Sequence, residues 1–114
     1  MKYLLMIYGN DDIWGSLPEQ EWERFVAEHD AVNQELTEAG ILLYAHGVAD
    51  QDQAKVVRVE GGTPAVTDGP YVEAKEYIGS FYVIDVEDHD TALEVAARIP
   101  SSRLTGVEVR PIHG

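Results

Sequence analysis

The chain has 114 residues, of which 45% are hydrophobic and 25% charged, a composition that fits one globular domain and excludes a mainly disordered chain. Eight Lys and Arg against 21 Asp and Glu give a net charge of −13, so we expect neither a nucleic acid nor a membrane as a partner. The lack of cysteine excludes disulfides, thiolate nucleophiles and cysteine-based metal sites. No apolar run reaches the length of a signal-peptide core or a transmembrane helix. We therefore expect a single cytoplasmic domain over residues 1–114.

The first half of the chain predicts a strand, a long helix and a second strand. Residues 2–8 are apolar on both faces and end at turn-forming residues, which favours a strand that is covered on both sides. A helix is expected from a cap at Ser16 to Ala39, because apolar residues repeat at helical spacing and Gly40 can adopt the left-handed conformation that ends a helix. Residues 41–49 have two alternating apolar faces and predict the second strand.

A hairpin and a further central strand are predicted next. Residues 54–60 and 63–67 are expected to pair around Gly61-Gly62, a two-residue connection that admits positive φ at both positions. The run at 68–70 then interrupts the ladder, since proline lacks an N–H. Residues 78–86 are apolar on both faces and predict a strand in the centre of the sheet.

A second helix and a last strand complete the predicted elements. The helix is expected over residues 89–99, with Asp88 as its cap. Its expected inner stripe consists of Leu93, Ala96 and Ala97. Residues 105–112 predict an alternating strand in which Val107 and Val109 face inward.

The order of these elements predicts a fold of the α+β class. A βαββββαβ order lets each helix join strands of one antiparallel sheet, as in ferredoxin-like folds, here with an inserted hairpin. Two helices cover only one face of such a sheet. Because the central strands are apolar on both sides, we expect a homodimer in which the uncovered sheet faces pack together.

Two polar side chains interrupt the apolar stripe of the first predicted helix. At about 3.6 residues per turn, His29 falls in the middle of the stripe and Asn33 lies one turn further along. A buried imidazole needs a partner, and two interpretations follow. In one, His29 is structural and bonds to Asn33, to a backbone carbonyl or to a strand tyrosine such as Tyr3 or Tyr44. In the other, it is an acid/base or ligand-orienting group at the floor of a pocket.

The turn at Asp68-Gly69-Pro70-Tyr71 also has two interpretations. An Asp side chain often stabilises such a turn through its own backbone. Alternatively, the turn directs Asp68 or Glu73 toward His29, and Lys75 adds a positive group to an acidic chain. Our hypothesis is that His29 and Asp68 line one ligand pocket.

Four segments resemble a known family: residues 1–8, 29–40, 67–76 and 107–111. The most specific part is the run Asp-Gly-Pro-aromatic-x-Glu-x-Lys-Glu, in which Tyr71 stands where Phe is usual. The chain resembles the YCII-related family, in its DGPF-domain branch, over nearly its whole length. The resemblance implies a dimeric α/β-barrel.

The resemblance also bears on function. Related members look like enzymes with a His and an Asp in a pocket, and one type is associated with dechlorination of a substituted hydroquinone. Many DGPF-type members have no assigned activity and often occur alongside sigma factors. His29 corresponds to the family histidine. The family Asp, which precedes a Pro after the second helix, is replaced here by Ile99.

We therefore expect a small-molecule-binding protein, with His29 as a general acid/base in lyase- or dehalogenation-like chemistry and Asp68 as its partner. The expected ligand-binding residues are Asn33, Tyr44, His46, Tyr71, Glu73 and Lys75. The alternative is a non-catalytic ligand-sensing or protein-interaction module. The sequence contains no phosphate-binding glycine loop, dinucleotide fingerprint or nucleophile elbow, so we expect no nucleotide-dependent chemistry and no serine hydrolysis. We expect no cofactor and assign no metal-binding residues.

Overall fold

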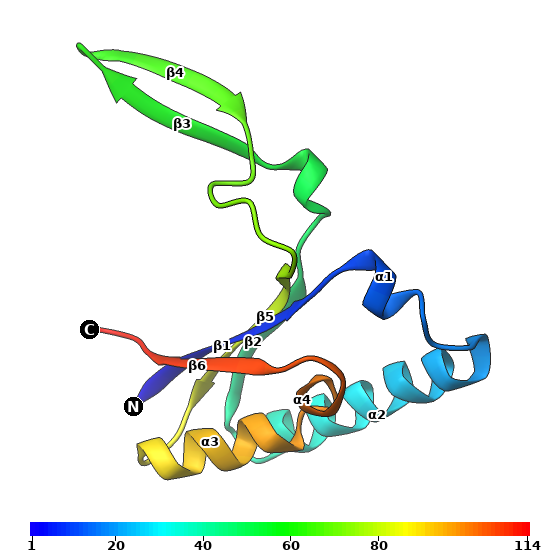
Figure 1. Ribbon diagram of the computed structural model, residues 1–114. Coiled ribbons are helices and arrows are strands. Elements are labelled where there is room, and N and C mark those ends of the chain that lie inside the picture. Colours follow the sequence, from blue (N-terminus) through cyan, green and yellow to red (C-terminus); the bar gives the residue numbers. More distant parts are fainter.

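The central sheet has four antiparallel strands in the order β2-β5-β1-β6, in a computed structural model that describes residues 1–114 (Figure 1). The strands are β1 (Lys2–Gly9), β2 (Leu42–Gly47), β5 (Tyr77–Asp85) and β6 (Val107–Pro111). The crossovers through helices and this order are those of a ferredoxin-like fold, so the predicted α+β class is confirmed.

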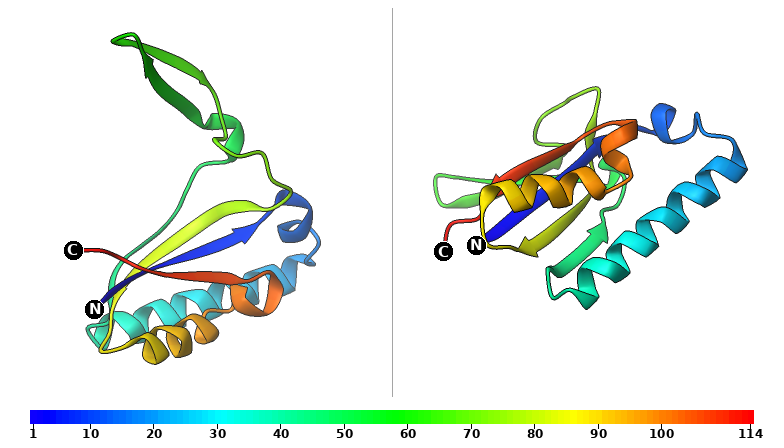
Figure 2. Two further views of the ribbon diagram at one scale, coloured as in Figure 1. Left: turned by 60° about the vertical axis from the view of Figure 1, so that its left-hand side comes forward. Right: turned by 90° about the horizontal axis from the view of Figure 1, so that it is seen from below.

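The two long helices lie on one face of this sheet (Figures 1 and 2). They are α2 (Glu19–Glu38) and α3 (His89–Arg98), and three short helical turns accompany them: α1 (Asp11–Trp14), η1 (Gln51–Gln53) and α4 (Ser101–Leu104). Two ion pairs join α2 to the elements beside it, Glu35 with Arg98 at 2.6 Å and Glu28 with Arg103 at 2.5 Å. None of the helices is both long and apolar enough to cross a membrane.

The predicted start of the first long helix was wrong. The helix begins after Pro18 with no side-chain cap, and the Ser16 hydroxyl instead donates to the carbonyl of Ile13 at 2.6 Å. The reason is that residues 11–14 form α1, capped by Asn10, whose side chain accepts from the Ile13 N–H at 2.8 Å. The predicted end is confirmed, because Gly40 has φ +74° just beyond the helix.

The second long helix begins as predicted, but its buried stripe differs. The Asp88 carboxylate accepts hydrogen bonds from the N–H and the hydroxyl of Thr91, both at 2.8 Å, and the backbone bond is the main reason that the pKa of Asp88 lies below its usual value. Ala96 is buried as expected, whereas Leu93 and Ala97 are exposed. Ala92 and Val95 take their places, because they share a helix face with Ala96 and Leu93 is rotated away from it.

The core lies between the helices and the inner face of the sheet. It is a single cluster of buried residues: Tyr3, Leu5, Ile7, Leu36, Tyr82, Ile84, Val86, Ala92, Val95, Ala96 and Ile99. Val107 and Val109 of β6 pack against it, as their alternation predicted. Ile99 is fully buried in this cluster, so an apolar side chain belongs at this position.

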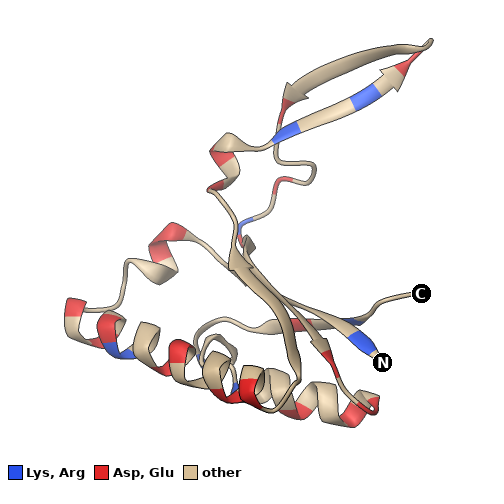
Figure 3. Cartoon of the chain, turned by 180° about the vertical axis from the view of Figure 1, so that it is seen from behind, with Lys and Arg blue, Asp and Glu red and all other residues tan.

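The inserted hairpin stands away from the sheet (Figures 1 and 2). Strands β3 (Lys55–Glu60) and β4 (Thr63–Asp68) pair only with each other, and the turn residues Gly61 and Gly62 have φ of +56° and +80°, as predicted. The projection explains a radius of gyration of 16.2 Å, against about 13 Å for a compact chain of this length. Figure 3 shows acidic positions, in red, along the helices, and basic positions, in blue, on the hairpin, where Lys55 and Arg58 lie.

Candidate functional site

An aromatic cavity of about 310 Å³ opens where α1, α2 and α4 meet the end of the sheet. Its apolar lining consists of Ile7, Trp14, Trp22, Phe25 and Val26. Its polar lining consists of His29, Asp30, Ser80 and Ser101. We call this space the aromatic cavity; its size is at the lower end of the range for ligand pockets.

Trp14 forms one wall of the aromatic cavity because two glycines leave room for its indole ring. A Cβ on Gly79 would lie 2.5 Å from Trp14 Cη2, and one on Gly9 would lie 2.6 Å from Trp14 Cζ2. The indole also packs edge-on against Tyr77, with ring centroids 5.9 Å apart. The short helix α1 therefore places this indole ring against the sheet, at the edge of the cavity.

The opposite wall is a row of rings on α2. Trp22 stacks on Phe25 with centroids 5.9 Å apart, and the rings of Phe25 and His29 make an edge-to-face contact with centroids 4.5 Å apart. These residues are three and four positions apart, which is the spacing that puts side chains on one helix face. His29 is thus the polar end of an aromatic wall.

Both ring nitrogens of His29 have partners. Nδ1 lies 2.9 Å from the carbonyl oxygen of Phe25, and Nε2 lies 2.8 Å from the Oγ of Ser101. A carbonyl oxygen only accepts, so in the neutral ring Nδ1 carries the proton and Nε2 accepts from the Ser101 hydroxyl. Of the structural partners considered from the sequence, the backbone carbonyl is the one observed, and His29 also lines the cavity.

A second, more polar cavity of about 310 Å³ adjoins His29. It is lined by His29, Asn33, Ala45, His46, Gly47, Ser80 and Tyr82, and we call it the polar cavity. The Tyr82 hydroxyl donates to Asn33 Oδ1, and burial raises the pKa of Tyr82, so the phenol remains neutral at neutral pH. His29 and Ser80 line both cavities, so the aromatic and the polar space meet at these two residues.

Some of the expected ligand-binding residues lie at this site. Asn33 and His46 line the polar cavity, in agreement with their expected place near His29. Tyr44 contacts the ring of His46, with centroids 4.7 Å apart, and stacks on Phe81, but it is exposed and lines neither cavity. The structure thus places His29, Asn33 and His46 around one cavity, and their role in ligand binding stays a prediction.

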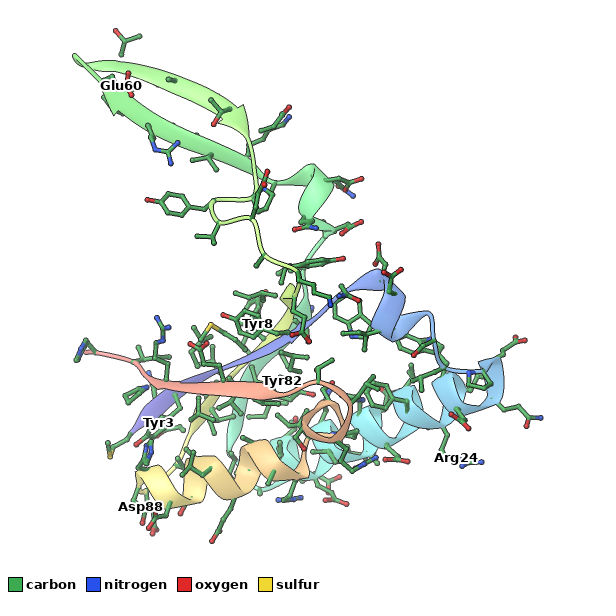
Figure 4. The ribbon with its side chains drawn as sticks, viewed as in Figure 1. Tyr3, Tyr8, Arg24, Glu60, Tyr82 and Asp88 are labelled. Atoms are coloured by element: carbon green, nitrogen blue, oxygen red, sulfur yellow. The ribbon has the colours of Figure 1, made fainter.

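The turn after the hairpin does not reach His29, and the predicted pairing of His29 with Asp68 is corrected. Asp68 ends β4 opposite Lys55, pairs with its ammonium group at 2.5 Å, and has a side chain 88% exposed. The hairpin that carries Asp68 projects away from the sheet; Glu60 lies near its tip, far from Tyr82 of the site (Figure 4). Nε2 of His29 is partnered by the Ser101 hydroxyl instead.

The other expected residues of this loop also lie away from His29. Tyr71 is exposed, with the guanidinium of Arg58 5.2 Å from its ring centroid. Glu73 lines a separate surface cavity with Gly69 and Pro70, and Lys75 is exposed. Within one chain these three side chains contact neither the aromatic nor the polar cavity.

Several residues that line the two cavities were not predicted as site residues from the sequence, and Trp14 and Ser101 are the most informative of them. Trp14 lies between the first predicted strand and the first predicted helix, where no element was predicted, although Asn10 followed by two Asp residues is typical of a capped helix start. Ser101 lies 72 positions from its partner, and only the folded topology brings them together. Pro100 before it was the available signal, since proline is favoured at helix starts.

Comparison with known proteins agrees with the fold and with the segments that suggested a family. The family model described as "YCII-related domain" matches residues 1–113. A protein of Rhizobium meliloti (strain 1021) named "Uncharacterized protein R00369" is 32% identical over 114 residues, which cover 98% of this chain and 92% of that protein. The finer assignment to the DGPF-domain branch stays a prediction.

Proposed function

The chain belongs to the YCII-related family, and on that basis we propose that it binds a small neutral aromatic molecule, with His29 as the proton-transferring group of the site. The observation that carries this proposal is the position of His29, where an aromatic cavity and a polar cavity meet. A ring would occupy the aromatic cavity, and its hydroxyl group would lie beside His29 and replace the Ser101 hydroxyl as the partner of Nε2. A phenol or a hydroquinone has this chemistry.

The lining of the aromatic cavity supports a single-ring ligand. Rings of Trp14, Trp22 and Phe25 offer stacked and edge-on contacts, each of which contributes about 0.5–1.5 kcal/mol beyond the burial of apolar area. Asp30 lines the same cavity, and the chain carries a net charge of −13, so an anionic ligand would be repelled. These features favour a neutral phenol over a carboxylate.

Hydroquinone is the probe that tests this function. We expect saturable binding, seen as quenching of tryptophan fluorescence and as a shift of the His29 ring signals in NMR spectra. His29→Ala removes the hydrogen-bonding group and should weaken binding about tenfold or more, a change of about 1.4 kcal/mol.

The matched control is His113→Gln, at an exposed histidine that lines neither cavity. This variant should bind hydroquinone like the unchanged protein. Equal binding by His29→Ala and the unchanged protein would contradict the proposal. Binding with no reaction of any phenol would favour the ligand-sensing alternative.

The proposal includes a homodimer through the open face of the sheet. Leu4, Met6 and Tyr8 of β1 alternate with the core residues Tyr3, Leu5 and Ile7, so they lie on the face opposite the helices. Phe81 and Val83 of β5 pair with Met6 and Leu4 and extend this apolar surface. Packing against the same face of a second copy would remove it from water and form the dimeric α/β-barrel.

Light scattering tests the dimer. We expect a mass twice that of one chain, and Phe81→Glu should produce monomers because it places a charge in the centre of an apolar interface. Leu93→Glu, at an exposed position of α3, is the control and should leave the mass unchanged. A monomeric unchanged protein, or a dimer that survives Phe81→Glu, would rule out this interface.

A further inference from the structure

Ser101 and His29 form a hydrogen-bonded pair at the wall of the aromatic cavity. The Ser101 hydroxyl donates to Nε2 of His29 at 2.8 Å, while the Phe25 carbonyl holds the proton on Nδ1. In a base-activated nucleophile, a hydroxyl donates to the unprotonated nitrogen of an imidazole, and a third group orients the ring. The groups here have this arrangement. We propose that Ser101 is a nucleophile for acyl transfer from small neutral aryl esters, with His29 as its base. This proposal replaces the expectation, drawn from the lack of a nucleophile elbow, that the chain carries out no serine hydrolysis.

Burial sets Ser101 apart from the other polar residues. It is 5% exposed and, apart from two tyrosines, it is the only polar residue among the buried ones. Its neighbour Ser102 satisfies its own hydroxyl locally, by donating to the Ala97 carbonyl at 3.1 Å. Ser101 instead donates its hydroxyl to the ring of His29 on α2. Both residues line the aromatic cavity.

The elements that carry the pair are held together on both sides of it. Glu28 precedes His29 on α2, and its carboxylate pairs at 2.5 Å with Arg103, two residues after Ser101 on α4. Arg98 and Glu35 make a second contact between α2 and the end of α3. Both ion pairs are exposed and each contributes little to stability, but the pair of Glu28 with Arg103 joins α4 directly to α2.

The reaction balances with water as the second substrate. Ser101 Oγ bonds to the ester carbonyl carbon while its proton passes to Nε2 of His29. The bond from that carbon to the leaving oxygen then breaks, and Nε2 returns the proton to the departing phenol. Water attacks the acyl-serine with its proton passing to Nε2, and Ser101 leaves with that proton as the carboxylic acid forms. The Phe25 carbonyl accepts from Nδ1 throughout and supports the transient imidazolium.

The cavity selects the class of ester. This inference rests on the proposed function, because the aryl group occupies the same aromatic cavity as a phenol and the phenol is the first product. The lining of Trp14, Trp22 and Phe25 suits an uncharged ring, and Asp30 disfavours an anionic ester. Phenyl acetate is the simplest member of this class.

A fluorophosphonate probe, which reacts with activated serines, tests the nucleophile directly. We expect one adduct per chain by mass spectrometry of the intact protein, placed on Ser101 by peptide mapping. The adduct should be absent in Ser101→Ala, unchanged in Ser102→Ala, and formed about a hundredfold more slowly in His29→Ala, since a positioned base contributes about 10²–10⁴ in rate. Phenyl acetate should give an acetyl adduct at the same residue.

The outcomes separate this inference from the proposed function. If the unchanged protein forms no adduct, or forms one on another residue, the assignment of Ser101 as the nucleophile is overturned. This result does not depend on whether any variant folds. If hydroquinone still binds in that case, the proposed function stands alone. Labelling of Ser101 in a protein that does not bind hydroquinone supports the nucleophile and overturns the phenol as the ligand class.

Discussion

Leu36→Ala is expected to lower the free energy of unfolding by about 3 kcal/mol, within the range of roughly 2–5 kcal/mol for buried leucines. Leu36 is 1% exposed and is the only buried residue of the 20-residue helix α2. Its removal leaves a cavity at the only fully buried contact of this helix with the core, beside the partly buried Val32. Because the same helix carries His29 and the aromatic wall, hydroquinone affinity should fall with stability.

Leu93→Ala makes the same change in the other long helix and serves as the control. Leu93 is 44% exposed, so Leu93→Ala should lower the free energy of unfolding by less than about 1 kcal/mol. The change in helix propensity is the same in both variants. Urea denaturation followed by circular dichroism measures both values. Equal losses for the two variants would contradict the assignment of Leu36 to the core.

The second large effect is expected from Gly79→Ala, which adds one methyl group beneath Trp14. That methyl would lie 2.5 Å from the indole ring, so the ring must leave its place against the sheet. We expect tryptophan emission to shift to longer wavelength as Trp14 meets water. Hydroquinone binding should weaken about tenfold, as expected for the loss of one aromatic contact of about 1.4 kcal/mol.

Gly106→Ala provides the comparison, because a Cβ at Gly106 has nothing within 4 Å and its φ is not positive. Emission and binding should not change in that variant. Binding that is unaffected by Gly79→Ala, despite a shifted emission spectrum, would show that Trp14 is not part of the ligand site.

Most of the fold could be predicted because its strands and long helices follow from the spacing of apolar residues along the chain. The alternation of Tyr3, Leu5 and Ile7 with their neighbours, and the turn at Gly61-Gly62, depend on residues adjacent in the chain. The short helices α1 and α4 span four residues each, too few to show a helical period. Leu93 was predicted on the buried face of its helix but lies on the exposed face. Consecutive residues on a helix point in directions about 100° apart, so an error of one position moves a side chain to another face.

The candidate site was predictable only in part, for a related reason. His29 could be identified because a polar residue on an apolar stripe conflicts with its local pattern. Its partner could not, since contact with Ser101 depends on how α4 packs beside α2. Asp68 was assigned to the site because a turn motif does not encode the direction in which its hairpin projects.

The projecting hairpin bears on how this chain can change over evolutionary time. The polypeptide leaves the sheet after Gly47 and returns at Tyr77, and Gly47 pairs with Ser80 on the neighbouring strand. The insertion therefore starts and finishes at nearly one point, and its strands share no ladder with the sheet. Lengthening, shortening or losing it changes only a loop between antiparallel neighbours, a change that costs little loop-closure entropy. Descendants of this chain can thus acquire or discard an arm while the pairing of β2 with β5 is inherited intact.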